Sequence, residues 1–420
     1  MVDLRKIVKH SANLSLYLLS SVITSILGIV VNPFLAANLS PHDYAVLGYF
    51  LSFNLLISPI ISFSLLSFYS RNYFKIKEEN RQEVIDTLLI TQVIMGLAGL
   101  LFALCGFYLY FKIAEVNFPF YPYALLCFVP LFFTCFYNFL LVDIRMKRQA
   151  LQYLKITVAY ALSGVLFALL FVVILKRGAI GRFWSILIPA VGIGIYSFKK
   201  LYAKSQFNKK ILKDAIQFGW PISVSAILYY FLSGVDRAML ERLNDPVTFG
   251  NYNVAIQISG YLYIFYAALN QTFEPDIYRS IAENKIKKLT MIVIMIAVLT
   301  AIPTIIFIIF AEPVIRILTY GRYMAATDFA QVLALKNIPM AFCFLISNVI
   351  IGFGYPKVEL VNRIAGAALS IIAYRLLIMK NGFFGAAVGN SVSYVIMTII
   401  SSLFILYKLN PFKINRKRSV

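Results

Sequence analysis

The chain has 420 residues, of which 60% are hydrophobic and only 14% are charged, and its mean hydropathy is +0.80. Soluble globular domains contain about 45–50% apolar and about 25% charged residues, so this composition excludes an ordinary water-soluble protein. The formal net charge is +21, but the basic residues lie in short clusters between apolar runs and not on one polar face, which argues against nucleic acid as a partner.

Twelve apolar windows follow one another along the chain, each close to the roughly 20 helical residues that cross a bilayer. The sequence therefore predicts an all-α polytopic membrane protein of about twelve spans, in direct contact with membrane lipid. Prolines 59, 189, 221 and 303 fall inside windows, and we expect them to interrupt or bend those helices. The windows are 14–35, 44–68, 84–110, 123–142, 156–175, 183–198, 218–240, 252–273, 289–310, 329–351, 360–379 and 385–407.

The basic residues that flank the windows predict the orientation of the protein. If the N-terminus is cytoplasmic, the inner segments hold 28 Lys and Arg residues and the outer segments hold 10. Because cytoplasmic loops carry the excess of basic residues, we expect both termini and the loop 199–214 in the cytoplasm. Lys336 lies inside the tenth window and belongs to neither group.

The two halves of the chain resemble each other. KRGAIGRF (176–183) matches KNGFFGAA (380–387) with an offset of 204 residues, and NLSPHDYA (38–45) resembles RLNDPVTFG (242–250). Each half has six windows, so both halves enter the membrane in the same sense and form a parallel repeat. We predict two six-helix lobes, covering residues 1–208 and 209–420.

The sequence carries no sign of a cofactor, a metal or catalytic chemistry. Only two histidines are present, the four cysteines lie inside apolar runs, and no Walker-type glycine-rich loop occurs. The predicted cysteine state is the free thiol. We expect a transporter that performs no covalent chemistry.

Several segments resemble the Wzx-type polysaccharide flippases, in the superfamily that also includes multidrug (MATE) exporters and lipid II flippases. The resemblance covers nearly the whole chain. It is carried by NLSPHDYAVLGYF after the first window, GVDRAMLERLNDPVTFGNYNVA (234–255), TYGRYMAATDFAQVLAL (319–335) and the glycine motif at 382–387.

This resemblance implies a V-shaped, alternating-access transporter with a cavity between two lobes. The implied cargo is an oligosaccharide repeat unit on undecaprenyl pyrophosphate, moved across a bacterial inner membrane for O-antigen, capsule or exopolysaccharide synthesis. A polysaccharide polymerase and a chain-length regulator are the implied protein partners.

Polar residues deep in the windows are the candidate substrate-binding residues, because an ionisable side chain in a span usually faces a cavity or a partner. For the charged candidates the alternative is a side chain that extends to the membrane interface. Asp236 and Arg237 are neighbours, so we expect one to point inward, where the Asp could bind a proton or cation, and the other toward the interface. The candidates are Lys336, Arg363, Arg375, Asp236, Arg237, Asn270 and Gln271.

Four charged residues at the inner ends of windows are candidates for gating. Each is also explained by a simpler role in capping a loop or anchoring a helix end at the interface. They are Asp143, Arg145, Glu274 and Asp276.

Two other functions compete with flipping. A cation-coupled exporter of drugs or metabolites would share the fold, but the basic bias of the deep charges favours an anionic cargo. A membrane polysaccharide polymerase usually carries a long outer loop, whereas the outer segments here are short and lack paired carboxylates.

Overall fold

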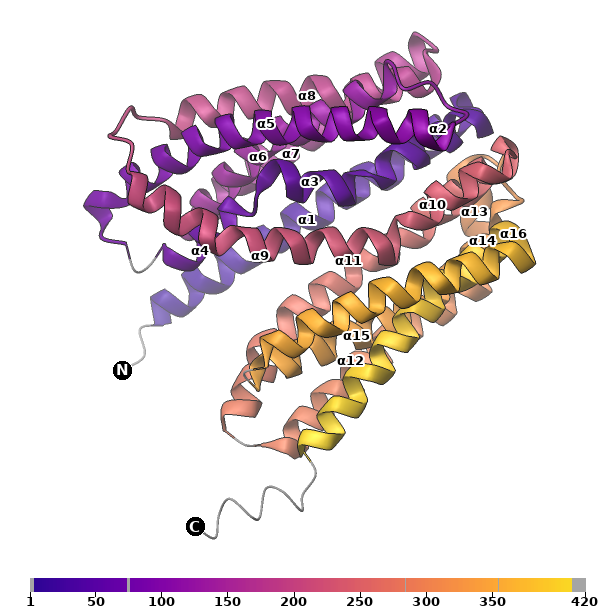
Figure 1. The fold of residues 1–420 in the computed structure, drawn as a ribbon. Coiled ribbons are helices and arrows are strands. Elements are labelled where there is room, and N and C mark those ends of the chain that lie inside the picture. Colours follow the sequence, from indigo (N-terminus) through magenta and orange to yellow (C-terminus); the bar gives the residue numbers. More distant parts are fainter. Residues whose placement is uncertain (1–3, 74–75, 284, 354, 410–420) are drawn as a thin grey trace. The chain divides into compact units, whose positions relative to one another are not determined.

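The computed structural model describes residues 4–73, 76–283, 285–353 and 355–409 (Figure 1). Within these residues every regular element is helical and no β-strand occurs. Two compact units are present, which we name unit 1 (residues 1–227 and 318–320) and unit 2 (residues 228–317 and 321–420). The predicted lobe boundary at residues 208 and 209 stays a prediction.

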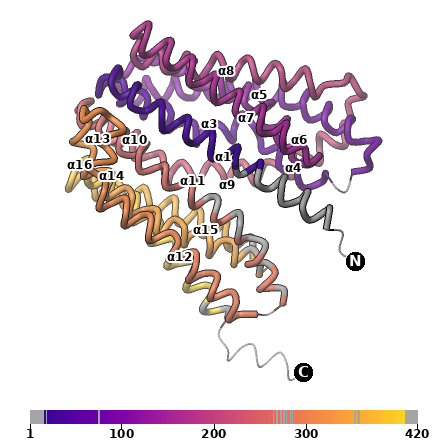
Figure 2. Tube along the Cα trace, turned by 180° about the vertical axis from the view of Figure 1, so that it is seen from behind, coloured from indigo at the N-terminus to yellow at the C-terminus, as the bar shows by residue number. Residues whose placement is uncertain are grey.

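Unit 1 is a bundle of long apolar helices in which α6 packs on α8 and α1 packs along α7 (Figure 2). Its elements are α1 (Leu4–Asn38), α2 (Pro41–Ser52), α3 (Asn54–Ser62), α4 (Leu65–Asn72), η1 (Glu78–Asn80), α5 (Arg81–Ala114), α6 (Tyr123–Met146), α7 (Ala150–Ala168), η2 (Leu169–Ile174), α8 (Gly178–Leu201) and most of α9 (Lys209–Ser233).

Unit 2 is a second helical bundle, in which α15 packs on α16 and α12 packs on α15. Its elements are α10 (Val235–Leu240), η3 (Glu241–Leu243), α11 (Pro246–Ala282), α12 (Ile286–Ile309), α13 (Ala311–Thr319), α14 (Ala326–Leu335), α15 (Asn337–Gly352) and α16 (Pro356–Leu409).

The predicted number of spans agrees with these helices. Ten helical stretches in the described part of the chain are long and apolar enough to cross a membrane. One of them, Val358–Ile405, bends at Gly382 and supplies two spans. The 37-residue α11 covers the remaining window and exceeds the roughly 20 residues that a span needs. The chain is therefore a multi-pass integral membrane protein, as predicted.

Local geometry repeats between the two units where the sequence matched. Gly178 and Gly382 have φ angles of +55° and +54°, a backbone region that favours glycine. Each begins a helical segment, and the glycine three residues later packs against a carbonyl of the preceding helix, Phe171 for Gly181 and Leu377 for Gly385.

The helix caps repeat as well. Ser40 caps α2 and precedes Pro41, and its hydroxyl accepts from the N–H of Asp43. Asp245 caps α11 and precedes Pro246, and its carboxylate accepts from the N–H of Thr248. Both arrangements are the expected N-cap chemistry with proline in the first turn. The repeat predicted from sequence is thus present at the level of backbone and caps.

The positions of the helix breaks agree with the proline positions only in part. Pro189, Pro221 and Pro303 lie within α8, α9 and α12, which continue through them. In a membrane helix, neighbouring groups can satisfy the carbonyl that proline frees. Within the predicted windows, breaks occur between α2 and α3, between α3 and α4 just after Pro59, between α9 and α10, and between α14 and α15 just before Pro339.

The segment between α8 and α9 is bound to the first turns of α5. The Asp86 carboxylate is completely buried and accepts from the N–H groups of Ala203 and Ser205, at 3.1 and 2.7 Å, and from the Ser205 hydroxyl. Asn208 donates from its amide to Glu83 at 2.8 Å. These bonds hold the connection that precedes α9 against unit 1.

Candidate functional site

Two broken helices bring charged residues together inside unit 2. The seventh span breaks at Gly234, between α9 and α10, and the tenth breaks at Lys336, between α14 and α15. Asp236 and Arg237 follow the first break, and Lys336 lies within electrostatic range of both. Broken helices at membrane depth expose backbone groups and are common at ion and substrate sites.

Asp236 is the centre of this arrangement. Its side chain is completely buried, and its Oδ2 accepts from the hydroxyl of Tyr252 at 2.7 Å. Its Oδ1 is buried and has no hydrogen-bond partner among the residues that the structure describes. A buried carboxylate oxygen without a donor is costly, so this atom is available to a proton, a cation or water.

The residues around Asp236 form a dense polar group, which we name the Asp236 cluster: Asp236, Arg237, Lys336, Tyr252 and Tyr374. Arg237 is 9% exposed and donates to the carbonyl of Ser233 at 3.2 Å. Tyr374 is completely buried and donates to the carbonyl of Leu232 at 2.9 Å. Lys336 is half-buried.

The amides beside the cluster extend it. Asn337, next to Lys336, is completely buried, and neither its Oδ1 nor its Nδ2 has a hydrogen-bond partner in the described part of the chain. Asn390 on α16 is also completely buried and lies beside Tyr252. A buried polar group without a partner calls for an explanation, such as a functional role or an ordered water or ion.

The prediction that Asp236 and Arg237 diverge, one inward and one to the interface, is wrong. Both are buried, at 0% and 9% exposure. The expectation assumed a regular helix across the seventh window, whereas the break at Gly234 starts a new short helix whose first residues are Val235 and Asp236.

Arg363 and Arg375 lie apart from each other on the first half of α16, as the twelve-residue spacing requires. Arg363 donates from Nε to Glu359 at 3.0 Å, and Glu359 is 6% exposed and also accepts from the Ser347 hydroxyl. The charge of Arg363 is therefore compensated within the protein. Arg375 is exposed.

The two predicted amides on α11 are only partly described. Asn270 donates to the carbonyl of Tyr266 at 3.2 Å, and its Oδ1 is buried without a partner among the described residues. The side chain of Gln271 lies outside the part of the chain that the structure describes.

The gating candidates make local contacts. Asp143 is buried and accepts from the Tyr69 hydroxyl at 2.8 Å and from Lys147 at 2.7 Å. Arg145 donates to the Tyr153 hydroxyl at 3.1 Å. The substrate and gating roles of all these residues stay predictions.

The two remaining gating candidates are Asp276 and Glu274. Asp276 faces Lys288 at 3.5 Å with both side chains 47% exposed, which is a weak surface pair. The side chain of Glu274 lies outside the described residues.

Sequence reasoning missed Tyr252 and Glu359 as partners of the predicted charges, and it missed Tyr374 as a neighbour of Asp236. Tyrosine is common in membrane spans, so its type alone carries no signal. Glu359 could have been found, because it lies four residues before Arg363, the spacing of a helical ion pair.

Two protein-family models match the chain. Residues 11–277 match the model of the family described as "Polysaccharide biosynthesis protein". Residues 221–376 also match the MatE model.

Among curated proteins, two uncharacterized membrane proteins of Methanocaldococcus jannaschii are similar. One is 22% identical over 274 residues, which is 61% of this chain and 54% of that protein. The other is 23% identical over 221 residues, which is 51% of this chain and 52% of that protein. The chain thus spans about half the length of these relatives.

Solved transporter structures share the fold. An inward-facing multidrug resistance MATE family transporter of the MOP superfamily has a TM-score of 0.76 at 15% identity, covering 94% of this chain and 96% of that one. The lipid II flippase MurJ, in an inward closed conformation, has a TM-score of 0.71 at 14% identity, covering 94% and 87%. At such identities the likeness concerns the fold alone.

Proposed function

Because the chain belongs to the polysaccharide biosynthesis protein family, we propose that it is a flippase for undecaprenyl-pyrophosphate-linked oligosaccharide repeat units. The match over residues 11–277 is the observation that carries this proposal. In it, the glycan crosses the bacterial inner membrane from the cytoplasmic to the periplasmic leaflet, and both termini of the protein are cytoplasmic. The polysaccharide polymerase and the chain-length regulator are its proposed partners.

The chemistry of the Asp236 cluster supports an anionic cargo. A sugar pyrophosphate must leave water to cross hydrocarbon, at a cost of several kcal/mol for each unsatisfied polar group. The cluster holds two basic side chains, Arg237 and Lys336, against one carboxylate, Asp236. This excess of positive charge would lower the barrier for a pyrophosphate, and the unpartnered Asp236 Oδ1 could take up a proton or a cation during the cycle.

A cation-coupled exporter of drugs or metabolites is the second candidate, favoured by the MatE match over residues 221–376. An organic cation bound at Asp236 would lie near the positive charges of Arg237 and Lys336, and their repulsion disfavours this cargo. Neither function requires a covalent step by the protein.

Deletion of the gene followed by leaflet-resolved analysis of lipid-linked glycans tests the proposal. A flippase mutant should accumulate undecaprenyl-linked repeat units on the cytoplasmic leaflet and lose the surface polysaccharide. If the deletion mutant instead shows a normal distribution of glycan between the leaflets and an increased sensitivity to organic cations, the protein is an exporter and the flippase proposal is wrong.

A further inference from the structure

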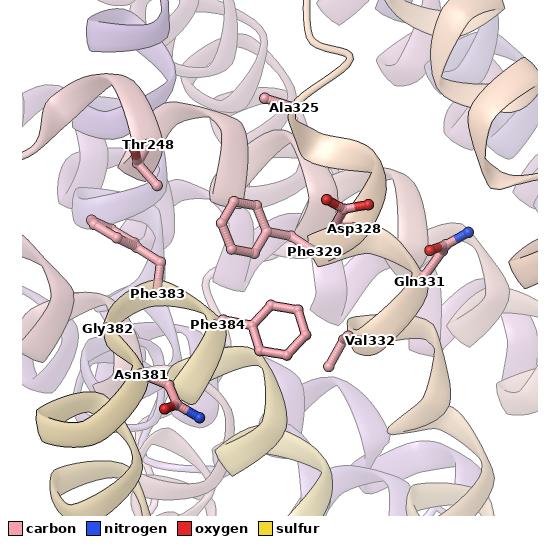
Figure 3. Close-up of a pocket in the computed structure, with 10 residues that line it drawn as sticks. All are labelled: Thr248, Ala325, Asp328, Phe329, Gln331, Val332, Asn381, Gly382, Phe383 and Phe384. Atoms are coloured by element: carbon pink, nitrogen blue, oxygen red, sulfur yellow. The ribbon is translucent and has the colours of Figure 1, made fainter.

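A cavity of about 770 Å³ lies in unit 2 where three helical segments begin or bend (Figure 3). These are the N-terminal turn of α11, the N-terminal turn of α14 and the bend of α16 at Gly382. The volume is within the roughly 300–1,000 Å³ of pockets that hold small molecules. In the predicted orientation these helix ends face the periplasm, and we name this cavity the outer pocket.

The lining of the outer pocket combines aromatic rings with groups that bind hydroxyls. Phe329 on α14 and Phe384 on α16 contribute rings from two sides, and Phe384 is 43% exposed (Figure 3). Asp328 and Asn381 are exposed and make no side-chain hydrogen bond within the described part of the chain, so both can bind a ligand. None of the lining residues is basic, so the pocket lacks the charge to hold a pyrophosphate.

At the matching position in unit 1, a hydrogen bond joins the starts of two helices. There the Asp43 carboxylate accepts from the N–H of Ala179 at 2.8 Å and so joins the start of α2 to the start of α8. In the repeat register, Thr248 stands where Asp43 does and Phe383 where Ala179 does. Thr248 donates its hydroxyl and its N–H to Asp245, which lowers the pKa of Asp245 below its usual range, and does not close the gap.

Tyr252 connects the pocket to the Asp236 cluster. The ring of Tyr252 packs edge-on against Phe329, with centroids 5.8 Å apart, and lies 6.4 Å from the ring of Phe383. Its hydroxyl donates to Asp236 at 2.7 Å. Tyr252 therefore touches the wall of the pocket with its ring and the buried carboxylate with its hydroxyl.

We propose that the outer pocket binds the uncharged sugar rings of the cargo, with Phe329 and Phe384 stacking on their apolar faces and Asp328 and Asn381 bonding their hydroxyls. This inference rests on the proposed function. A sugar ring has apolar C–H faces and polar hydroxyls at its edge, so it matches a lining that combines aromatic rings with polar side chains. In this proposal the pocket binds only the glycan, and the pyrophosphate binds at a separate basic site.

The test uses full-length protein in nanodiscs and the oligosaccharide released by mild acid from the lipid-linked glycan of the deletion strain. Saturation-transfer NMR reports which sugar protons lie against protein rings. Binding should weaken roughly tenfold in Phe384→Leu, which keeps the apolar bulk but loses the ring, and persist in Phe384→Tyr. Asp328→Asn should weaken binding, whereas Phe310→Leu, another exposed phenylalanine outside the pocket, should not.

The outcomes separate the pocket from the proposed function. If deletion traps lipid-linked glycan but Phe384→Leu and Asp328→Asn bind the oligosaccharide as the wild type does, the flippase stands and the pocket proposal is overturned. Failure of the wild type to bind the oligosaccharide overturns it as well. Binding of tetraethylammonium in its place, abolished by Asp328→Asn, would assign the pocket to an organic cation. Loss of binding and of glycan export at normal protein abundance supports the proposal.

Discussion

The hydrogen bond between Tyr252 and Asp236 gives the most direct test of the buried cluster. Tyr252→Phe removes only the hydroxyl and keeps the ring that packs on Phe329. Because Asp236 Oδ1 already has no partner among the described residues, the variant leaves both oxygens of this buried carboxylate without a hydroxyl donor. A hydrogen bond to a charged group contributes about 1.5–3 kcal/mol.

Tyr374→Phe is the matched control. Tyr374 is equally buried, but its hydroxyl donates to the neutral carbonyl of Leu232, a bond that contributes about 0.5–1.5 kcal/mol. Thermal unfolding of both variants in the same detergent should show a larger decrease in midpoint for Tyr252→Phe, on the order of a few degrees.

A double variant separates the energy of the Tyr252–Asp236 interaction from the effects of removing the hydroxyl or the carboxylate alone. In Asp236→Asn the charge is absent, so adding Tyr252→Phe should cost less than it does in the wild type, and the two changes should not be additive. Equal shifts for the two tyrosine variants, or full additivity with Asp236→Asn, would refute the idea that the Tyr252 hydroxyl stabilises the buried Asp236 side chain.

Three further predictions follow from the fold. Asp86→Ala removes the acceptor of three hydrogen bonds from Ala203 and Ser205, and proteolysis between α8 and α9 should become faster than in the wild type. Asp245→Ala should lower the free energy of unfolding by about 1 kcal/mol at neutral pH. The bonds from Thr248 lower the pKa of Asp245, so this stabilisation is present above the ordinary pKa and is lost as the pH falls through the lowered value. The stabilities of the variant and the wild type should therefore become equal in acid. A reporter fused after Tyr407 should be active only in a format that reports the cytoplasm, and periplasmic activity would contradict the predicted orientation.

The repeat and the number of spans could be predicted from sequence because both depend on local signals. Hydropathy reports burial in lipid over each window, and Gly178 and Gly382 reveal a backbone conformation that favours glycine. The caps at Ser40 and Asp245 are equally local, since the capping side chain and the backbone N–H that donates to it are three residues apart. Such features need no knowledge of tertiary contacts.

The composition of the cluster could be predicted only in part. Asp236, Arg237 and Lys336 were candidates because charge is rare in spans, and the structure brings these three together. Tyr252 could not be identified, because its role depends on packing between α10 and α11, which no residue pattern reports. The break at Gly234 was missed because a glycine in an apolar window is compatible with a continuous helix.

Lys336 and Arg363 are both candidate substrate-binding residues from the sequence, but their surroundings predict different outcomes for their variants. Lys336 makes no ion pair in the described part of the chain, and Lys336→Ala removes one of the two cations of the Asp236 cluster. Export of the glycan should decrease while protein abundance stays close to normal, and Lys336→Arg should retain part of the activity because the charge is kept.

Arg363→Ala should instead reduce protein abundance, because it leaves the 6% exposed Glu359 without its cation, and a buried carboxylate without a compensating charge is destabilising. The double variant Arg363→Ala/Glu359→Gln should restore abundance, since the uncompensated charge is gone. Quantitative immunoblots and surface-polysaccharide assays at native expression separate the two effects. If Lys336→Ala exports normally, the cation of the cluster lies off the transport route; if Arg363→Ala is abundant but inactive, Arg363 contacts the cargo and its pairing with Glu359 is incidental.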